Sequence, residues 1–160
     1  MKEITESEAL GKMAAYCSMA EHCASEVVAK LEGWNIAPEA VERILERLNK
    51  EKYIDETRYC RCFVKDKLCF NKWGKVKIAQ ALYQKRISSE AIRTSIEDID
   101  DDEYQKILLE LIAAKKKSVK AKNDYELNGK LIRFALGRGF GMDAIRRSLK
   151  QLGSDIELDY

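Results

Sequence analysis

Hydrophobic residues recur along this chain at the spacing of amphipathic helices. Three stretches follow an i, i+3, i+4 pattern, which places their apolar side chains on one helix face. They comprise Leu10, Met13, Ala14 and Cys17; Tyr59, Cys62 and Phe63; and Tyr104, Ile107, Leu108 and Leu111. A single proline among 160 residues agrees with a mostly helical chain. The pattern predicts an all-α protein.

The same pattern repeats along the chain. Residues 27–45, 78–96 and 131–149 align when Ala40, Ala91 and Ala144 are matched, with periods of 51 and 53 residues. Self-similarity at a fixed period is the sequence signature of a repeat architecture. Each segment predicts a helix, a tight turn and a second helix. Three sets of apolar positions coincide: Val41, Ile92 and Ile145; Leu45, Ile96 and Leu149; and Ile36, Ile87 and Phe140.

The turns of the three segments carry different residues. We expect Gly33 to end the first helix in a left-handed conformation, and Pro38 to lie in the first turn of the next. Ser88 or Ser89 should cap the matching helix of the second segment. In the third segment, the turn should be looser or more closely packed than the others, because it holds Gly137, Gly139 and Gly141.

A further helix precedes each pair, so we predict three tandem three-helix repeats of the helix-turn-helix kind. Their expected bounds are 1–53, 54–100 and 101–153, followed by an acidic tail, 154–160. A unit of about 50 residues has a small core and should pack on its neighbours, as repeat proteins do. We therefore expect an elongated, curved array.

The net charge of +2 conceals a strong alternation along the chain. Residues 1–57 carry 7 basic and 12 acidic side chains, whereas residues 58–95 carry 10 and 2. Residues 96–112 carry 1 and 7, residues 113–150 carry 11 and 3, and the last ten carry 3 acids. The two basic blocks favour an acidic partner, or one that carries nucleic acid.

The junction between the first two repeats combines a helix start with a basic stripe. Asp55 is expected to cap the helix, Glu56 to reinforce the cap, and Tyr59, Phe63 and Val64 to face inward. Three cations at i, i+3 and i+7 should lie outward along one stripe: Arg58, Arg61 and Lys65. Such a stripe is either a solvated face or a contact surface.

The following loop favours a contact surface. Lys72, Lys75 and Lys77 surround Trp73 and Gly74 there. Lysines attract an anionic backbone, and an aromatic ring can stack on a base or fill a protein pocket. Arg86 adds to this predicted contact. A secondary basic cluster is either a solvated helix end or a further contact: Lys115, Lys116, Lys117, Lys120 and Lys122.

Nothing in the sequence indicates an enzyme. His22 next to Cys23 could form a catalytic pair, but adjacent helical residues point about 100° apart, so a surface histidine and a packed cysteine are expected. The five cysteines lack the paired spacing of a zinc site and fit core positions. The acidic run 97–103 should cap a helix rather than bind a cation. The stretch 137–141 lacks the Lys-Ser/Thr of a phosphate loop. We expect neither metal nor cofactor.

The junction motif resembles that of the bacterial RecX regulatory proteins, whose signature is similar to G-Y-[IL]-D-[DE]-x-R-[FY]-A. Six residues match it in order, whereas Lys52 and Cys60 replace the glycine and alanine; the matching residues are Tyr53, Ile54, Asp55, Glu56, Arg58 and Tyr59. The loop Trp73-Gly74-Lys75 is similar to the family's G-K-G, and the likeness spans about residues 8–152. In the first repeat, Ala20 and Glu21 stand where the family has an arginine before the histidine.

This resemblance implies a non-enzymatic cytoplasmic regulator that binds the recombinase RecA and RecA-coated single-stranded DNA. It implies inhibition of ATPase, strand-exchange and co-protease activities in DNA repair, recombination and the SOS response. We expect a monomer that has no membrane segment, with weak direct DNA binding left open. Two alternatives remain: a stand-alone helical nucleic-acid binder and a peptide-docking scaffold.

Overall fold

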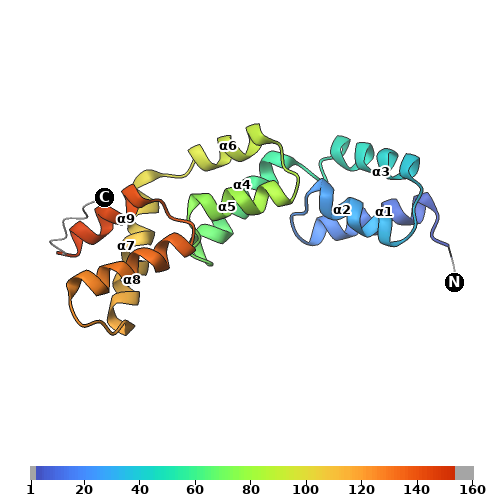
Figure 1. Cartoon of the computed structure of the whole chain (residues 1–160). Coiled ribbons are helices and arrows are strands. Elements are labelled where there is room, and N and C mark those ends of the chain that lie inside the picture. The colour runs from blue at the N-terminus through green and yellow to red at the C-terminus, as the bar shows by residue number, and fades with distance from the viewer. Residues whose placement is uncertain (1–2, 154–160) are drawn as a thin grey trace. The chain divides into compact units, whose positions relative to one another are not determined.

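The computed structural model describes residues 3–153, and within that range the chain forms nine α-helices and no strand (Figure 1). This confirms the all-α prediction and the three helical triplets. The helices are α1 (Glu6–Met19), α2 (Ala24–Gly33), α3 (Pro38–Lys50), α4 (Glu56–Cys69), α5 (Lys75–Gln84), α6 (Ser89–Glu97), α7 (Asp101–Ser118), α8 (Asp124–Gly137) and α9 (Met142–Gln151). The predicted acidic tail, 154–160, lies outside the described residues.

The turn between the second and third helix of each triplet has one geometry. Asn35, Arg86 and Gly139 have φ of 57°, 61° and 93°. Each N–H donates to the carbonyl three residues earlier, and the next residue donates to the carbonyl five residues earlier. Paired bonds of this kind define a Schellman motif, whose left-handed residue ends the helix. The motif recurs at the periods of 51 and 53 read from the sequence.

The prediction for Gly33 is wrong. Gly33 is still helical, and the left-handed residue is Asn35, two positions later. Asparagine tolerates this conformation because its short polar side chain can bond locally, so the nearby glycine was a misleading signal. Pro38 does open α3 as expected.

The predicted helix caps are confirmed. The backbone N–H of Arg58 donates to Asp55 Oδ1 at 3.0 Å, and that of Ala91 to Ser88 Oγ at 3.2 Å. Within the acidic run, Asp100 accepts the N–H of Glu103 at 2.9 Å and caps α7. The backbone at each of these helix starts gains a partner for an N–H group that the helix leaves free.

The contacts divide the chain into two compact units, each described here by itself. Unit 1 comprises Met1–Phe63 and Leu82–Ile92, and unit 2 comprises Val64–Ala81 and Arg93–Tyr160. Helices α4, α5 and α6 therefore each contribute residues to both units. The predicted repeat boundaries after residues 53 and 100 follow the order of the helices along the chain and stay predictions.

Unit 1 has its core between α1, α2 and α3. Met13, Leu31, Ile44 and Leu48 are at most 1% exposed there. Cys17, Cys23 and Cys60 are buried as small hydrophobic residues, as predicted for the cysteines, whereas Cys62 is exposed. The expected inward position of Cys62 is thus wrong, because the buried face of α4 passes through Tyr59, Cys60 and Val64.

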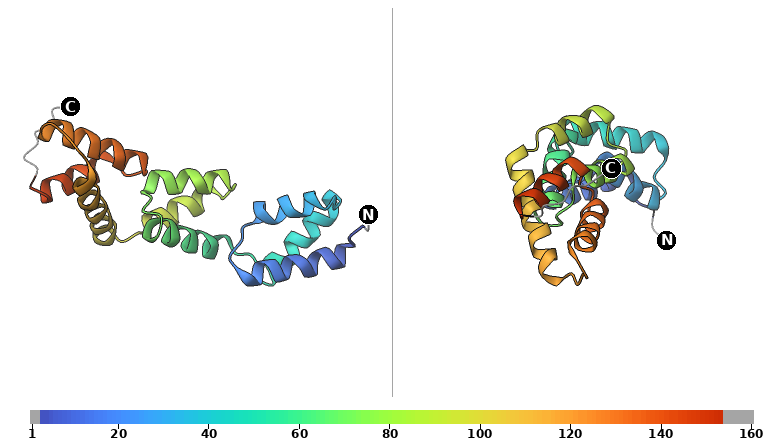
Figure 2. Two further views of the ribbon diagram at one scale, coloured as in Figure 1. Left: turned by 90° about the horizontal axis from the view of Figure 1, so that it is seen from below. Right: turned by 60° about the vertical axis from the view of Figure 1, so that its left-hand side comes forward.

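Unit 2 is centred on α7, α8 and α9, which pack on one another pairwise (Figures 1 and 2). Tyr104 and Phe140 meet in its core with ring centroids 5.2 Å apart, and Leu108, Leu131 and Ile145 are fully buried. The core also holds a polar contact. Gln105 Nε2 donates to Ser148 Oγ and to the Ala144 carbonyl, each at 2.7 Å. These bonds satisfy Ser148, which is wholly buried.

Candidate nucleic-acid and protein interface

The loop between α4 and α5 forms a cation–aromatic cluster in unit 2. Lys67 Nζ lies 5.0 Å and Lys77 Nζ 4.7 Å from the centroid of the Trp73 ring. The Trp73 N–H donates to the Lys67 carbonyl at 3.0 Å, which fixes the loop on the end of α4. Lys72 adopts a left-handed conformation, with φ of 57°. The half-buried indole is therefore covered by cations, whose charge its face stabilises.

The turn between α8 and α9 holds this loop by backbone contact. The Gly74 N–H donates to the Arg138 carbonyl at 2.7 Å, and the Val76 N–H to the Gly139 carbonyl at 3.0 Å. A Cβ on Gly74 would overlap the backbone of Gly139, and a Cβ on Gly139 would lie 2.6 Å from the Lys77 nitrogen. Of the two possibilities for the glycine-rich turn, close packing is the one found. The reason is that two chain segments meet there without side chains.

Arg138 extends the cluster toward α7 and α8. Its Nη1 donates to the Asn71 carbonyl at 2.9 Å, and its guanidinium carbon lies 5.4 Å from the Phe134 ring centroid. Lys115 Nζ lies 4.9 Å from the same centroid. We call the resulting set the basic–aromatic surface: Lys67, Lys72, Trp73, Lys77, Lys115, Phe134 and Arg138. It joins the loop after α4 to the predicted secondary cluster through its first lysine.

Sequence reasoning missed Lys67, Phe134 and Arg138. Arg138 stands in the glycine-rich stretch 137–141, whose sequence predicted a loose or closely packed turn and no phosphate loop, but indicated no partner for the arginine. Arg138 follows the exposed Leu136 by two residues and Phe134 by four. Nothing in this local sequence predicts that its guanidinium donates to the Asn71 carbonyl, 67 positions away. Only the Gly74–Gly139 contact brings the segments together.

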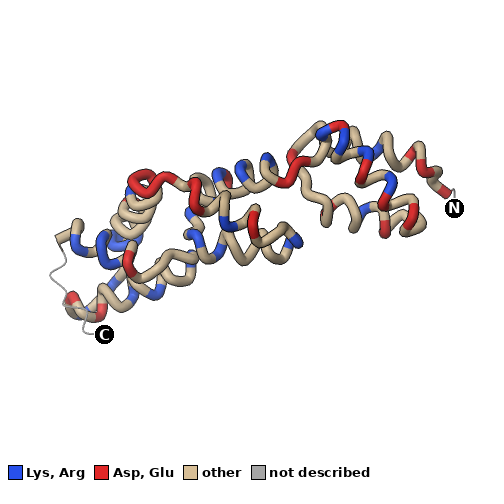
Figure 3. The backbone as a smooth tube through the Cα atoms, turned by 90° about the horizontal axis from the view of Figure 1, so that it is seen from above, with Lys and Arg blue, Asp and Glu red and all other residues tan. Residues whose placement is uncertain are grey.

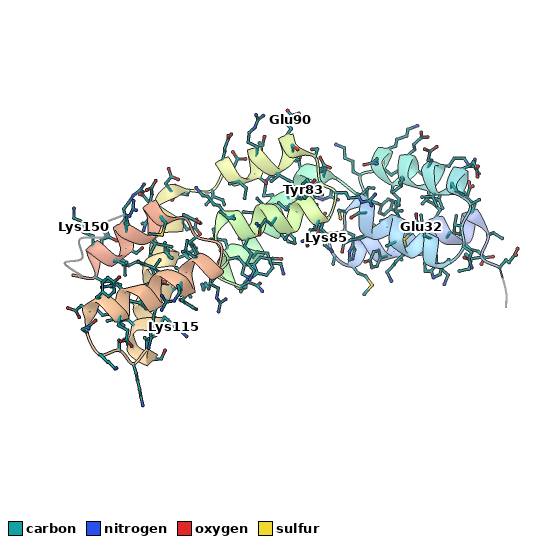
Figure 4. The ribbon with its side chains drawn as sticks, viewed as in Figure 1. Glu32, Tyr83, Lys85, Glu90, Lys115 and Lys150 are labelled. Atoms are coloured by element: carbon teal, nitrogen blue, oxygen red, sulfur yellow. The ribbon has the colours of Figure 1, made fainter. Side chains whose placement is uncertain are left out.

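The remaining lysines of the secondary cluster differ in exposure. Lys116 is half-buried at the end of α7, whereas Lys117, Lys120 and Lys122 are exposed. The Lys120 carbonyl accepts a hydrogen bond from Lys130 Nζ at 2.7 Å. Figure 4 labels Lys115 on α7. The described contacts thus tie Lys115 alone of these five to the basic–aromatic surface.

Lys75 turns away from Trp73. Its Nζ lies 4.6 Å from the Tyr104 ring centroid and 3.6 Å from Asp101 Oδ1, and its backbone N–H donates to the Tyr104 hydroxyl at 3.0 Å. Burial raises the pKa of Tyr104 despite the opposing effect of that hydrogen bond. Lys75 therefore fixes the start of α5 against α7.

Arg58 is engaged within unit 1 and is not a free outward cation. Its Nε donates to Glu21 Oε2 at 2.7 Å, and its Nη2 donates to the carbonyls of Lys52 and Tyr53 at 3.0 and 3.3 Å. The hydrogen bond with Glu21 raises the pKa of Arg58. This arginine joins the end of α1, the end of α3 and the start of α4. Glu21 was not singled out from the sequence, because 37 positions separate the pair.

Other residues of the junction motif also link helices in unit 1. Glu56 Oε1 accepts the Ser88 hydroxyl at 2.6 Å, so it connects α4 to the cap of α6 in addition to any effect on its own helix. Ile54 and Tyr59 are buried, and Tyr53 and Phe63 are half-buried. Arg61, Lys65 and Arg86 are exposed. Figure 4 labels Tyr83, in the last turn of α5, and Lys85, in the turn that leads to Arg86.

The His22–Cys23 pair occupies the link between α1 and α2, so the expected helix-surface position of His22 is wrong. The imidazole stacks on the Tyr16 ring, with the two ring centroids 3.6 Å apart. Cys23 Sγ donates to Glu26 Oε1 at 3.4 Å. The Cys23 N–H bonds the same carboxylate at 3.1 Å, which caps α2. The predicted packed cysteine is confirmed, and its thiol bonds Glu26.

Residues 3–153 contain neither a candidate metal site nor a candidate membrane span. No group of three or more His, Cys, Asp or Glu side chains gathers there as a metal site would need. No helix in this part of the chain is both long and apolar enough to cross a membrane. Figure 3 shows the charged positions along the backbone, including the acidic run that leads into α7.

The fold and its basic–aromatic surface define an all-helical protein built from three-helix units. Residues 55–96 match the family model "RecX, second three-helix domain", and residues 101–149 match "RecX, third three-helix domain". A "Regulatory protein RecX" of Chlorobium phaeobacteroides is 32% identical over 133 residues, covering 82% of this chain and 85% of the relative. The chain belongs to the RecX family of regulatory proteins.

Other relatives and solved structures agree. The Prosthecochloris aestuarii "Regulatory protein RecX" is 28% identical over 153 residues, covering 95% of this chain and 98% of that one. A crystal structure of RecX from Lactobacillus salivarius has a TM-score of 0.82 at 19% identity, over 92% of this chain and 96% of that chain. Another structure, "Crystal structure of regulatory protein RecX", has a TM-score of 0.83 at 21% identity. The match covers 91% of this chain and 73% of that chain. These structures support the fold.

The chain is shorter than several relatives. The match to the Clostridium botulinum strain Eklund 17B protein, at 30% identity, covers 71% of this chain but 53% of the relative. For the Lactobacillus johnsonii protein, the matched part is 52% of the relative. The chain thus spans about half the length of these two relatives.

Proposed function

We propose that this protein binds RecA and the RecA filament on single-stranded DNA and lowers its ATPase, strand-exchange and co-protease activities. The proposal rests on membership of a family of regulatory proteins and on the basic–aromatic surface. It is a binding function without a catalytic step. The protein then acts in the cytoplasm, where RecA filaments form during DNA repair and recombination.

One observation carries the proposal: the Gly74–Gly139 contact holds four cations around two aromatic rings on ordered elements of unit 2. Cations fixed in this way can face phosphates or carboxylates without losing much side-chain freedom on binding. Lys67 and Lys77 cover Trp73, and Lys115 and Arg138 cover Phe134. Such a surface fits a filament that presents the phosphates of a DNA backbone.

The residues proposed for the contact divide into two groups. In unit 2 we propose Lys65, Lys72, Trp73, Lys77 and Arg138, with Lys115 beside them. In unit 1, Arg61 and Arg86 are exposed and are proposed as further contacts. Arg58 and Lys75 are kept as positioning residues, because their charged groups already bind Glu21 and Asp101.

The decisive test is a comparison of two double charge reversals in RecA's DNA-dependent ATP hydrolysis. Lys72→Glu with Lys77→Glu should weaken inhibition about tenfold, since exposed charge contacts contribute up to about 1 kcal/mol each. Lys106→Glu with Lys150→Glu makes the same charge change at exposed positions of α7 and α9, and should stay within about twofold. If both variants lost inhibition equally, net charge alone would explain the effect, and the assignment of the contact to the basic–aromatic surface would be contradicted.

A stand-alone nucleic-acid binder is the second candidate, and the cation-covered aromatic rings favour it. It predicts tight binding to naked single-stranded DNA that weakens steeply with salt. A direct binding titration of naked single-stranded DNA with this protein, without RecA, separates the two functions when it is compared with the ATP hydrolysis assay. Inhibition at far less than one protein per RecA, with the DNA mostly uncovered, supports action on the filament.

A further inference from the structure

Unit 1 contains an apolar groove away from the junction residues. It encloses about 310 Å³ between the last turn of α2 and the first turns of α3. Ile36, Pro38 and Val41 supply its apolar lining. The Schellman turn shapes the groove, because the left-handed Asn35 reverses the chain and lets Pro38 begin the next helix.

Three glutamates complete the lining of this groove: Glu32, Glu39 and Glu42. All three are exposed, and none forms an ion pair among residues 3–153, although, after the hydrogen bond with Glu6, the charge of Glu39 helps to raise the pKa of Arg43. The arginines of α3 are occupied elsewhere. Arg43 Nη2 lies 2.6 Å from Glu6 Oε1, and Arg47 Nε lies 2.8 Å from Glu51 Oε1.

Glu32 is also placed against the rule for helix charges. It lies in the last turn of α2, where the carbonyl ends of the helix already present partial negative charge. A carboxylate at that position disfavours the isolated helix, so local stability does not account for it. The three carboxylates and the carbonyl end of α2 place negative charge along the rim of the groove (Figure 4 labels Glu32).

We propose that this groove binds a basic amphipathic segment of a partner protein. An aliphatic side chain of the segment lies on Ile36, Pro38 and Val41, and flanking lysines or arginines face the three glutamates. The charge of the rim selects this occupant, because an acidic or purely apolar segment would leave three carboxylates uncompensated or desolvated. The groove belongs to the acidic part of the chain, so the inference stands apart from the basic–aromatic surface and from RecA binding.

The test is an NMR titration of the full chain with the synthetic hexapeptide Lys-Lys-Leu-Val-Lys-Lys, blocked at both ends. We expect saturable shifts centred on the amides of residues 32–42. The control peptide Lys-Lys-Ser-Ser-Lys-Lys has the same charge and lacks the aliphatic pair, so it should bind at least about threefold more weakly. Equal binding of both peptides would reduce the interaction to unspecific charge attraction and overturn the proposal.

A matched pair of variants tests the rim. Glu42→Gln removes a groove charge, whereas Glu46→Gln removes an exposed charge one turn later on α3, outside the lining. Glu42→Gln should weaken the peptide about two- to fivefold, the range expected for an exposed ion pair, and Glu46→Gln should change it less than about 1.5-fold. Equal effects would contradict the proposal.

A second copy of this chain is the competing occupant of the groove, since one of its basic blocks could face the three glutamates. Light scattering across a hundredfold range of protein concentration decides this point. A constant monomer mass agrees with a foreign segment. A mass that rises with concentration and is lowered by Glu42→Gln, but not by Glu46→Gln, would assign the groove to self-association and overturn the proposal as stated.

Discussion

At the scale of single residues, two glycines decide how the candidate surface is held. Gly74 and Gly139 belong to loops 65 positions apart, and their backbones touch because neither has a Cβ. Gly139 also has φ of 93°, which side chains rarely adopt. The sequence showed that glycines crowd this turn, but their separate roles depend on the neighbouring chain.

Gly139→Ala should therefore destabilise the protein by about 2–4 kcal/mol, because strain at positive φ and the overlap with Lys77 add together. Urea unfolding followed by circular dichroism measures the change. Gly137→Ala is the matched control. Gly137 is helical with open space around its Cα, so alanine there should be neutral or stabilising by up to about 1 kcal/mol. A loss of similar size in both variants would contradict the close contact.

At the scale of helices, the Schellman turn and the Arg58 bonds set how the elements of unit 1 join. The turn motif could have been predicted at the right period, yet its left-handed residue is glycine in the third triplet alone. Asparagine and arginine occupy the other two places. Paired carbonyl bonds, together with an apolar residue after the turn that is half-buried at Ile36 and buried at Ile87 and Phe140, fix the motif strongly enough that glycine is not required. Glycine-based reasoning therefore misplaced the end of the first turn by two residues.

The ion pair between Arg58 and Glu21 should couple α1 to α4. In a double-mutant cycle with alanine at each position, we expect a coupling free energy of about 1 kcal/mol by urea unfolding, because both side chains remain partly exposed. The pair Arg47–Glu51, which joins α3 to its own C-cap residue and is more exposed, should couple less. If the two pairs coupled equally, Arg58 would be an ordinary surface cation and would return to the proposed contact set.

At the scale of the whole molecule, acidic and basic blocks alternate along the sequence, and three helices, α4, α5 and α6, contribute residues to both compact units. The repeat pattern predicts a division after residue 100, whereas the contacts group residues 64–81 with those from 93 onward. Loop contacts between α5 and the α8–α9 turn explain this grouping, because Gly74 and Val76 donate to carbonyls of the third triplet.

A fragment of residues 1–100 tests that dependence. It lacks the acceptors Arg138 and Gly139, so hydrogen exchange at the Gly74 and Val76 amides should become at least about tenfold faster than in the full chain. The amides of Ile36 and Tyr53 donate to carbonyls within unit 1 and should keep their protection. Unchanged protection at Gly74 and Val76 would mean that the first 100 residues hold this loop without the third triplet.

The sequence by itself determined the helical class, the repeat period, the cap at Asp55, a cap at Ser88 or Ser89, a cap within the acidic run 97–103, and the positions of the basic blocks. These features depend on spacing and on contacts between near neighbours, which the chain order contains. Tertiary structure decided which cations are free. It assigned Arg58 to Glu21 and Lys75 to Asp101, and brought Arg138 beside the loop of Trp73. Those partners lie 26 to 67 positions apart, and only packing selects among the many charges that could have met.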